Sequence, residues 1–411
     1  MSRLGKSVVV TLSIIVFGYA GLGYLLGKSD DDKTYRSLTV YGEVLQHIQE
    51  DYVDEPNLPV VTAGSLHGLL ESLDAQSAYL SPREYSDYRD RTKGGTHAST
   101  GLTLSKRYGY IIVVSELPGG PGEKAGLRSG DILEEVGGFA TRDMSVPQAY
   151  LLLDGAPGTT VKVDVVRRGA TEPQQIEVTR AVTDVPHLTA DKVSDDTAYV
   201  RLPTLDAGTA AELSAKLVQL QHQGAQKLVL DLRDCSTGPD SEGVAAAQLF
   251  LSSGEIGSLG GQTVEKQVFD AAPDKVVWHG PVEVLISDST SGAAEVLAAA
   301  IGENKRGDLV GERTFGSASE QKEIPLDDGA GLILTVAYYY APDGKAIIED
   351  GVPATVEVAP PTDQSDENVE TPAPLAAGQL PAKDDAVFSK ALDLLKAGTA
   401  PAGSAAPQKA S

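Results

Sequence analysis

The chain has 411 residues, of which 41% are hydrophobic and 22% charged, a composition typical of a globular protein with room for two folded domains and tails. Its formal net charge of -24 argues against nucleic acid as a partner, because a polyanion repels a strongly acidic chain. The single cysteine, Cys235, excludes an internal disulfide. We expect it to be an inert buried thiol, with a reactive thiol as the alternative.

The amino-terminal segment, 1–32, contains an uncharged apolar run over residues 7–27 that follows two basic residues. A helix of that length just crosses the hydrocarbon core of a bilayer, and basic residues before it favour a cytoplasmic N-terminus. The run predicts a single membrane anchor in the cell envelope, with the bulk of the chain extracytoplasmic, in the periplasm. The alternative is a signal peptide cleaved near Ala20, which releases a secreted protein.

Residues 33–95 form the next region, in which apolar positions from Val40 to Val53 recur at helical spacing. The pattern predicts an N-terminal helical region. This region is either a docking or dimerisation arm or a packing collar around the domain that follows.

Residues 96–183 change to short strands of alternating apolar and polar residues around the segment GGPGEKAGLRSGDILEEVGGF. Within it we expect a short helix over 123–127 and a Gly-Asp turn, followed by a strand over 132–136. The segment resembles the signature of the PDZ domains found in secreted proteases, and the likeness covers nearly the whole region.

The PDZ resemblance implies that an extended peptide is captured as an added strand, with its terminal carboxylate held by backbone N–H groups of a loop. In this chain the loop keeps only one glycine of the G-I-G pattern of the family. Retention of the PDZ domain as a structural lid is the alternative. The residues implied in peptide binding are Ser99, Thr100, Gly101 and Leu102.

Residues 184–358 alternate strands and helices, which indicates an α/β core. The segment KLVLDLR predicts a buried strand, because it is almost continuously apolar. Further on, a strand over 284–286 runs through a short polar turn into an alanine-rich helix that begins near Gly292. A strand, a tight turn and a helix start expose a nucleophile where free N–H groups can hold an oxyanion.

This turn, the LDLR strand and the later loop GERTFGSASEQ resemble those of the carboxy-terminal processing peptidases, or tail-specific serine proteases. The resemblance spans about residues 35–398. It implies an α/β protease core of the ClpP/crotonase type, at 184–358, with an inserted PDZ β-domain and an N-terminal helical segment. The core is followed by a Pro/Ala-rich tail, 359–411, with a short helix near 384–398.

The family places a serine nucleophile three residues before a glutamate and a lysine base four residues before a glutamine. Anchoring on Glu295 and Gln321 puts Gly292 at the serine position and Ser317 at the lysine position, so only Gln321 is retained. Glycine offers no nucleophile, and an unassisted serine hydroxyl is no base near neutral pH. Loss of the nucleophile alone costs on the order of a millionfold in turnover.

The loop after the LDLR strand retains Gly238, with Thr237 in place of the other member of the family's glycine pair. The resemblance implies that backbone amides at Gly238 and Ala293 form the oxyanion site, whereas Gly238 as an ordinary turn residue is the alternative. The chain is therefore predicted to be a serine-type peptidase homologue without catalysis. This pseudoprotease binds polypeptide tails or protein C-termini, or regulates an active homologous protease.

The alternative function is an active serine endopeptidase whose nucleophile has moved to Ser291. A shift of one residue at a helix start turns a side chain about 100° away from the oxyanion amides, which disfavours this interpretation. We expect no cofactor and no metal, because the six histidines are scattered and no phosphate-binding loop is present.

Overall fold

The structure is a computed structural model, and it describes residues 31–93, 98–167, 170, 172–184, 186–358, 379–382 and 384–398. The chain divides into two units, Met1–Ser65 and Leu66–Ser411. The first unit contains α2 (Asp31–Asp51) and the beginning of α3 (Leu58–Glu71). Several apolar side chains of α2 are exposed, among them Leu38 and Val44.

The prediction of a single N-terminal membrane anchor with a periplasmic body is contradicted. Among the described residues, no helix combines the length and the apolar character needed to cross a bilayer. Helix α2 has 21 residues but carries charged side chains along its length, which a bilayer core does not accept. The apolar run 7–27, and with it the cleavage alternative, lies outside the described residues.

A twisted antiparallel sheet forms the PDZ-like part of the second unit, with strands in the order β2-β3-β4-β6-β7 and β5 paired to β4. Alternate residues such as Val161, Val163 and Val165 are buried, so one face of the sheet makes the core. Strand β2 lies at the edge of the sheet. The elements are β2 (Leu102–Arg107), β3 (Tyr110–Glu116), α5 (Pro121–Ala125), β4 (Ile132–Val136), β5 (Phe139–Ala140), α6 (Val146–Leu153), β6 (Thr160–Val166) and β7 (Gln174–Thr179).

Strand β4 covers the expected range, whereas the short helix starts and ends earlier than the sequence predicted. It begins at Pro121, whose fixed φ suits the first helical turn, and it ends before Gly126, which adopts the left-handed conformation with φ 87°. The expected continuation to Leu127 is therefore wrong.

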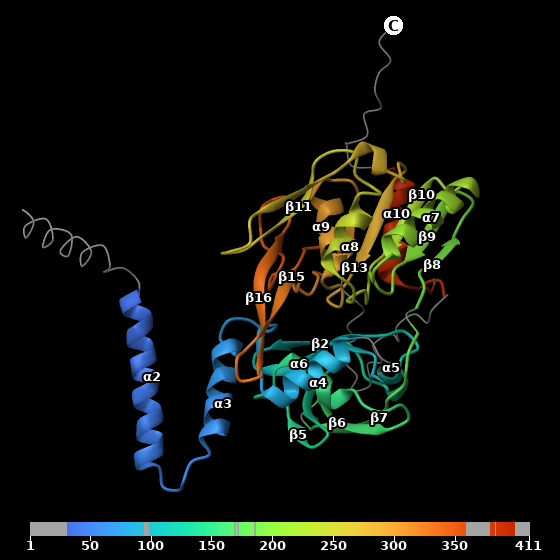
Figure 1. Cartoon of the computed structure of the whole chain (residues 1–411). Coiled ribbons are helices and arrows are strands. Elements are labelled where there is room, and N and C mark those ends of the chain that lie inside the picture. Colours follow the sequence, from blue (N-terminus) through green and yellow to red (C-terminus); the bar gives the residue numbers. More distant parts are fainter. Residues whose placement is uncertain are drawn as a thin grey trace, which may run out of the picture. The chain divides into compact units, whose positions relative to one another are not determined.

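A mostly parallel sheet, β17-β14-β13-β10-β9-β8, forms the centre of the α/β part (Figure 1). Leu228 and Leu230 pack with α7, α8 and α9, whereas Val229, between them, packs with α10. Helices therefore cover both faces of this sheet, as expected for an α/β core. Its elements are β8 (Thr189–Lys192), β9 (Thr197–Arg201), α7 (Thr209–His222), β10 (Lys227–Asp231), α8 (Asp240–Ala247), β13 (Val282–Ile286), α9 (Ala293–Glu303), β14 (Leu309–Gly311), β17 (Val356–Glu357) and α10 (Ala386–Ala397).

A second sheet, β1-β16-β11-β12 with β15 paired to β16, completes this unit. The long strand β16 pairs with strands from distant parts of the sequence, for example through Tyr79 of β1, which faces Leu332. The remaining elements are β1 (Ala78–Leu80), α4 (Pro82–Thr92), β11 (Glu255–Gly260), β12 (Gln267–Asp270), a 3-10 turn (Pro273–Lys275), β15 (Ser319–Pro325) and β16 (Gly331–Tyr340).

Candidate functional site

The turn between β13 and α9 places Gly292 where the family resemblance implies a serine nucleophile. Gly292 stands immediately before α9 with φ 59° and ψ -121°, a conformation that strains any residue with a Cβ. A backbone hydrogen bond joins this turn to the loop after β10, because Ser291 N–H donates to the carbonyl of Cys235 at 3.0 Å. The Cys235 thiol is buried, as expected, and burial raises its pKa, which disfavours the reactive thiolate.

The carboxylate of Glu295, on the first turn of α9, ties this turn to the loop that carries Ser317. Glu295 is fully buried and accepts hydrogen bonds from both segments. Burial raises its pKa, and the donated hydrogen bonds oppose that rise. The donors are Thr314 Oγ1 at 2.5 Å, Gly316 N at 2.6 Å, Ser317 N at 2.8 Å and Gly292 N at 2.9 Å.

The structure brings Gly292 and Ser317 face to face. A Cβ added to Gly292 would lie 3.8 Å from Ser317 Oγ, and this hydroxyl is hydrogen-bonded to Ser291 Oγ at 2.5 Å. The carbonyl of Ser317 accepts from Gln76 Nε2 at 2.9 Å. Gln321, a residue of β15, donates from its Nε2 to Ser319 Oγ at 2.9 Å. Ser317 therefore has hydroxyl and amide partners in this site.

Sequence reasoning missed Asp240, the first residue of α8. Its Oδ1 would lie 3.1 Å from a Cβ added to Gly292. Burial, followed by the negative charge of Glu295, raises the pKa of Asp240 to about 7. The space that a serine side chain would occupy is thus bordered by a titratable carboxyl group, and only its place two residues after Gly238 hinted at this role.

The oxyanion positions that the resemblance implied remain predictions. Gly238 has φ 113°, and a Cβ there would lie 2.0 Å from the carbonyl oxygen of Leu205, so only glycine permits this backbone approach. Ala293 is the first residue of α9. The neighbouring Thr237 Oγ1 is buried without a hydrogen-bond partner in the described part of the chain, so threonine fits this loop poorly.

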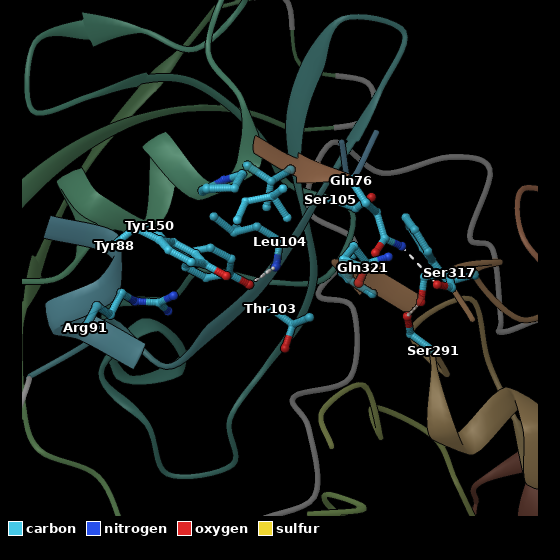
Figure 2. A pocket seen from close by; sticks show the side chains of 15 residues that line it. Gln76, Tyr88, Arg91, Thr103, Leu104, Ser105, Tyr150, Ser291, Ser317 and Gln321 are labelled. Carbon is cyan, nitrogen blue, oxygen red and sulfur yellow. Dashed lines mark hydrogen bonds between the residues drawn. The ribbon is translucent and has the colours of Figure 1, made fainter. Parts of the chain in front are cut away.

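A cavity of about 300 Å³ joins this turn to the PDZ-like sheet. Ser291, Ser317 and Gln321 lie at one end of it (Figure 2). Tyr88, Arg91 and Tyr150 lie at the other, and Thr103 and Leu104 of β2 lie between the two groups. The cavity therefore runs from β2, the edge strand of the PDZ-like sheet, to the turn that precedes α9.

Comparison with known proteins gives the family. The model of peptidase family S41 matches residues 196–358, and a PDZ domain model matches residues 112–167. The C-terminal processing peptidase of the chloroplast of Tetradesmus obliquus is 30% identical over 355 residues, which cover 81% of this chain and 76% of that protein. This chain belongs to the carboxy-terminal processing peptidases.

Other members show the same relationship. The carboxy-terminal-processing protease of Bartonella bacilliformis is 28% identical over 359 residues, 86% of this chain and 81% of that one. The solved structure of a photosystem II D1 C-terminal processing protease superposes with a TM-score of 0.67 at 27% identity, over 78% of this chain and 92% of that one. The S41 peptidase fold with a PDZ domain is thereby shown. These relatives are named as proteases, so the comparisons do not show the predicted loss of activity.

In this peptidase family member, the PDZ loop predicted to hold a carboxylate uses part of its donors internally. Ser99 N–H donates to the carbonyl of Ala181 at 3.0 Å, and Gly101 N–H donates to Ser99 Oγ at 3.2 Å. Thr100 is almost completely buried. Peptide binding by residues 99–102 stays a prediction, with at least two of the four N–H groups already occupied.

The PDZ domain contacts the loop that carries Ser317 and the loop that carries Gly238, which the sequence did not reveal. The Arg107 guanidinium lies 4.0 Å from the centre of the Phe315 ring and donates to the Phe315 carbonyl. On the other side, Ser236 Oγ donates to Thr103 Oγ1 at 2.8 Å.

The described residues hold no cluster of three or more His, Cys, Asp or Glu placed to bind a metal.

Proposed function

We propose that this member of the carboxy-terminal processing peptidases is a pseudoprotease, which holds extended polypeptide tails without cleaving them or regulates an active homologous protease. The observation that carries the proposal is the pair of positions that face each other at the start of α9. Gly292 supplies no oxygen there, and Ser317 supplies a hydroxyl in place of an amine. A Ser–Lys mechanism needs both an attacking oxygen and a neutral amine that accepts its proton.

Polypeptide binding is supported by features that do not depend on the missing groups. The family match and the PDZ match favour recognition of protein C-termini, and the cavity joins the edge strand β2 to the turn at Gly292. A tail that adds to β2 as an extra strand would lead towards that turn. Binding and cleavage are therefore separable in this chain.

The organisation that belongs to this proposal has an N-terminal region over 33–95, a PDZ domain over 96–183, a core over 184–358 and a tail over 359–411. A ClpP/crotonase-like fold of the core is supported by a mostly parallel sheet with helices on both faces. Membership of this fold does not require catalytic side chains, because the fold does not fix the chemistry of a site.

An endopeptidase that uses Ser291 is the second candidate, because Ser291 lines the cavity and is hydrogen-bonded to Ser317. Against it, the side chain of Ser291 precedes the helix start, and its hydroxyl partner is another hydroxyl group rather than a base. A hydroxyl without a base gains little nucleophilicity near neutral pH.

The test incubates the full chain with an unstructured protein that ends in an apolar tail, and follows the products by mass spectrometry. We expect the unmodified chain to bind the protein and leave it intact. Cleavage by the unmodified chain that disappears in the Ser291→Ala variant would establish the second candidate and remove the first.

The informative positive control restores both side chains in the Gly292→Ser plus Ser317→Lys variant. Cleavage by this variant alone would show that the rest of the pocket is competent. Position 292 carries backbone strain of about 1–3 kcal/mol for a residue with a Cβ, so folding of this variant is verified by circular dichroism before the assay.

A further inference from the structure

The edge of the PDZ sheet that β2 forms is partly occupied by a side chain of the protein itself. One side of β2 pairs with β3, and its other side has no partner strand in the described sheet. Leu104 N–H, in the middle of β2, donates to the hydroxyl of Tyr150 from α6 at 2.9 Å. A backbone donor that an added peptide strand would use is therefore satisfied internally.

Helix α4 holds Tyr150 in this position. The Arg91 guanidinium lies 4.5 Å from the centre of the Tyr150 ring, and Arg91 Nε is ion-paired with Asp154 just after α6. The side chains of Arg91 and Asp154 are 30% and 12% exposed, so solvent screens the pair only in part. Figure 2 shows Arg91 beside Tyr88 and Tyr150, at the end of the cavity away from Ser291.

Asp154 also lies beside the loop where a PDZ domain holds a carboxylate. Gly155 N–H donates to the carbonyl of Ala98 at 3.0 Å, which joins the end of α6 to the start of the loop 99–102. Two N–H groups of that loop have internal acceptors. An incoming carboxylate therefore needs a further donor, and Arg91 offers a guanidinium that is ion-paired with Asp154, the residue before Gly155.

We propose that Arg91 receives the terminal α-carboxylate of a bound polypeptide tail, and that Asp154 and Tyr150 are the internal competitors which keep the edge of β2 closed. The inference rests on the proposed function and names the residues that recognise the tail. Binding replaces the Asp154 carboxylate at Arg91 by the carboxylate of the tail. Tyr150 then leaves Leu104, and the freed N–H pairs with the tail as an added strand.

The cavity also indicates which tails fit. Its wall between β2 and α6 includes Leu104, Val114, Val146 and Pro147. Apolar side chains are favoured there, because burial of apolar surface stabilises binding. The ligand is therefore a tail with apolar last residues and a free carboxylate.

The experiment measures binding of a short labelled peptide with an apolar C-terminus to the full chain by fluorescence anisotropy, in a carboxylate form and in an amide form. Wild type is expected to prefer the carboxylate form roughly tenfold, as one charge-assisted contact allows. Arg91→Gln should abolish that preference. Asp154→Asn should strengthen binding of the carboxylate form several-fold, and Tyr150→Phe should strengthen binding of both forms about equally.

Arg89→Gln is the matched control, because Arg89 lies on the same helix and its own partner is Glu323 at 3.6 Å. It should keep the carboxylate preference. If Arg91→Gln fails to fold, Arg91→Lys tests the same point, since it retains the charge without the planar fork and should keep only part of the preference.

An unchanged carboxylate preference in Arg91→Gln, or weaker binding by Asp154→Asn, overturns this inference and leaves the proposed function in place. Cleavage of the peptide with a preference that still depends on Arg91 overturns the proposed function and leaves this inference in place. Failure of every variant to bind either form overturns the tail-binding role together with the inference.

Discussion

At the start of α9, buried hydrogen bonds join the two positions where the family resemblance implies reactive side chains, and these positions hold Gly292 and Ser317. At the edge of β2, in contrast, the groups suited to binding are present and satisfied by one another. Glu295 still joins Gly292 to the loop of Ser317, whereas Tyr150 covers Leu104. The difference teaches that buried hydrogen bonds, and not the side chains at positions 292 and 317, hold the shape of the site at α9, since the fold does not fix the chemistry of a site.

The largest effect is expected for Glu295→Ala, which breaks the contacts common to both loops. The substitution leaves the donors at Gly292, Gly316, Ser317 and Thr314 without their acceptor in a buried site. The free energy of unfolding, measured by urea titration, should fall by about 4 kcal/mol.

Glu303→Ala is the control for that measurement, because Glu303 lies at the exposed end of the same helix. It should change the free energy of unfolding by less than about 0.5 kcal/mol. Equal losses in the two variants would mean that Glu295 does not hold the site together.

The second prediction concerns Asp240 in the variant restored by Gly292→Ser and Ser317→Lys. An ionised carboxylate 3.1 Å from the Cβ position of residue 292 favours the protonated form of a nearby lysine, which is then no base. Addition of Asp240→Asn should raise turnover about thirtyfold at pH 8, roughly 2 kcal/mol of barrier, as measured by mass spectrometry of a cleaved peptide.

The advantage of Asp240→Asn should shrink below pH 6, because the pKa of Asp240 is raised to about 7 by burial and its carboxyl group is then neutral. Glu320→Gln, an exposed carboxylate in the same neighbourhood, is the control and should change turnover little. A restored variant that works equally well with and without Asp240 would show that this carboxyl group does not oppose the lysine.

The third prediction concerns Glu116 of the PDZ domain, which lies near Asp234 of the α/β core. Glu116, at the end of β3, is 5% exposed, and burial, followed by the charge of Asp234, raises its pKa from 4.5 to about 8. The other acidic groups that face it are Glu123 and Asp131. Because the folded state keeps a proton that the unfolded state has lost, stability should fall as the pH rises from about 5 to 8.

Glutamine at position 116 cannot lose a proton, so Glu116→Gln should not show this fall in stability. Between pH 5 and pH 9, the free energy of unfolding of the variant, measured by thermal or urea unfolding, should rise by about 2 kcal/mol relative to that of wild type. Glu134→Gln, an exposed carboxyl group of the same domain, is the control and should follow wild type. Parallel pH curves for Glu116→Gln and wild type would contradict the assignment.

The sequence predicted the α/β core and the meeting of positions 292 and 317, because these depend on strand and helix patterns and on motif spacing. It did not reveal Asp240 or the contact of Arg91 with Tyr150, because each joins elements that are distant in the chain and follow no short motif. Glu295 served only to align the motif, since its burial is a property of the folded state. The predicted membrane anchor is contradicted, because no helix among the described residues is long and apolar enough to cross a bilayer, and the apolar run 7–27 lies outside those residues.

The smallest effect is expected for Ser291→Ala, which removes the hydroxyl partner of Ser317. The two hydroxyl groups are 2.5 Å apart, and loss of one such hydrogen bond should cost about 1 kcal/mol or less in urea unfolding.

In the variant that carries Gly292→Ser, Ser317→Lys and Asp240→Asn, turnover should survive Ser291→Ala, because the attacking oxygen would then come from position 292. Loss of turnover in that background, with folding intact, would instead place the nucleophile at Ser291 and make the two regions parts of a working peptidase.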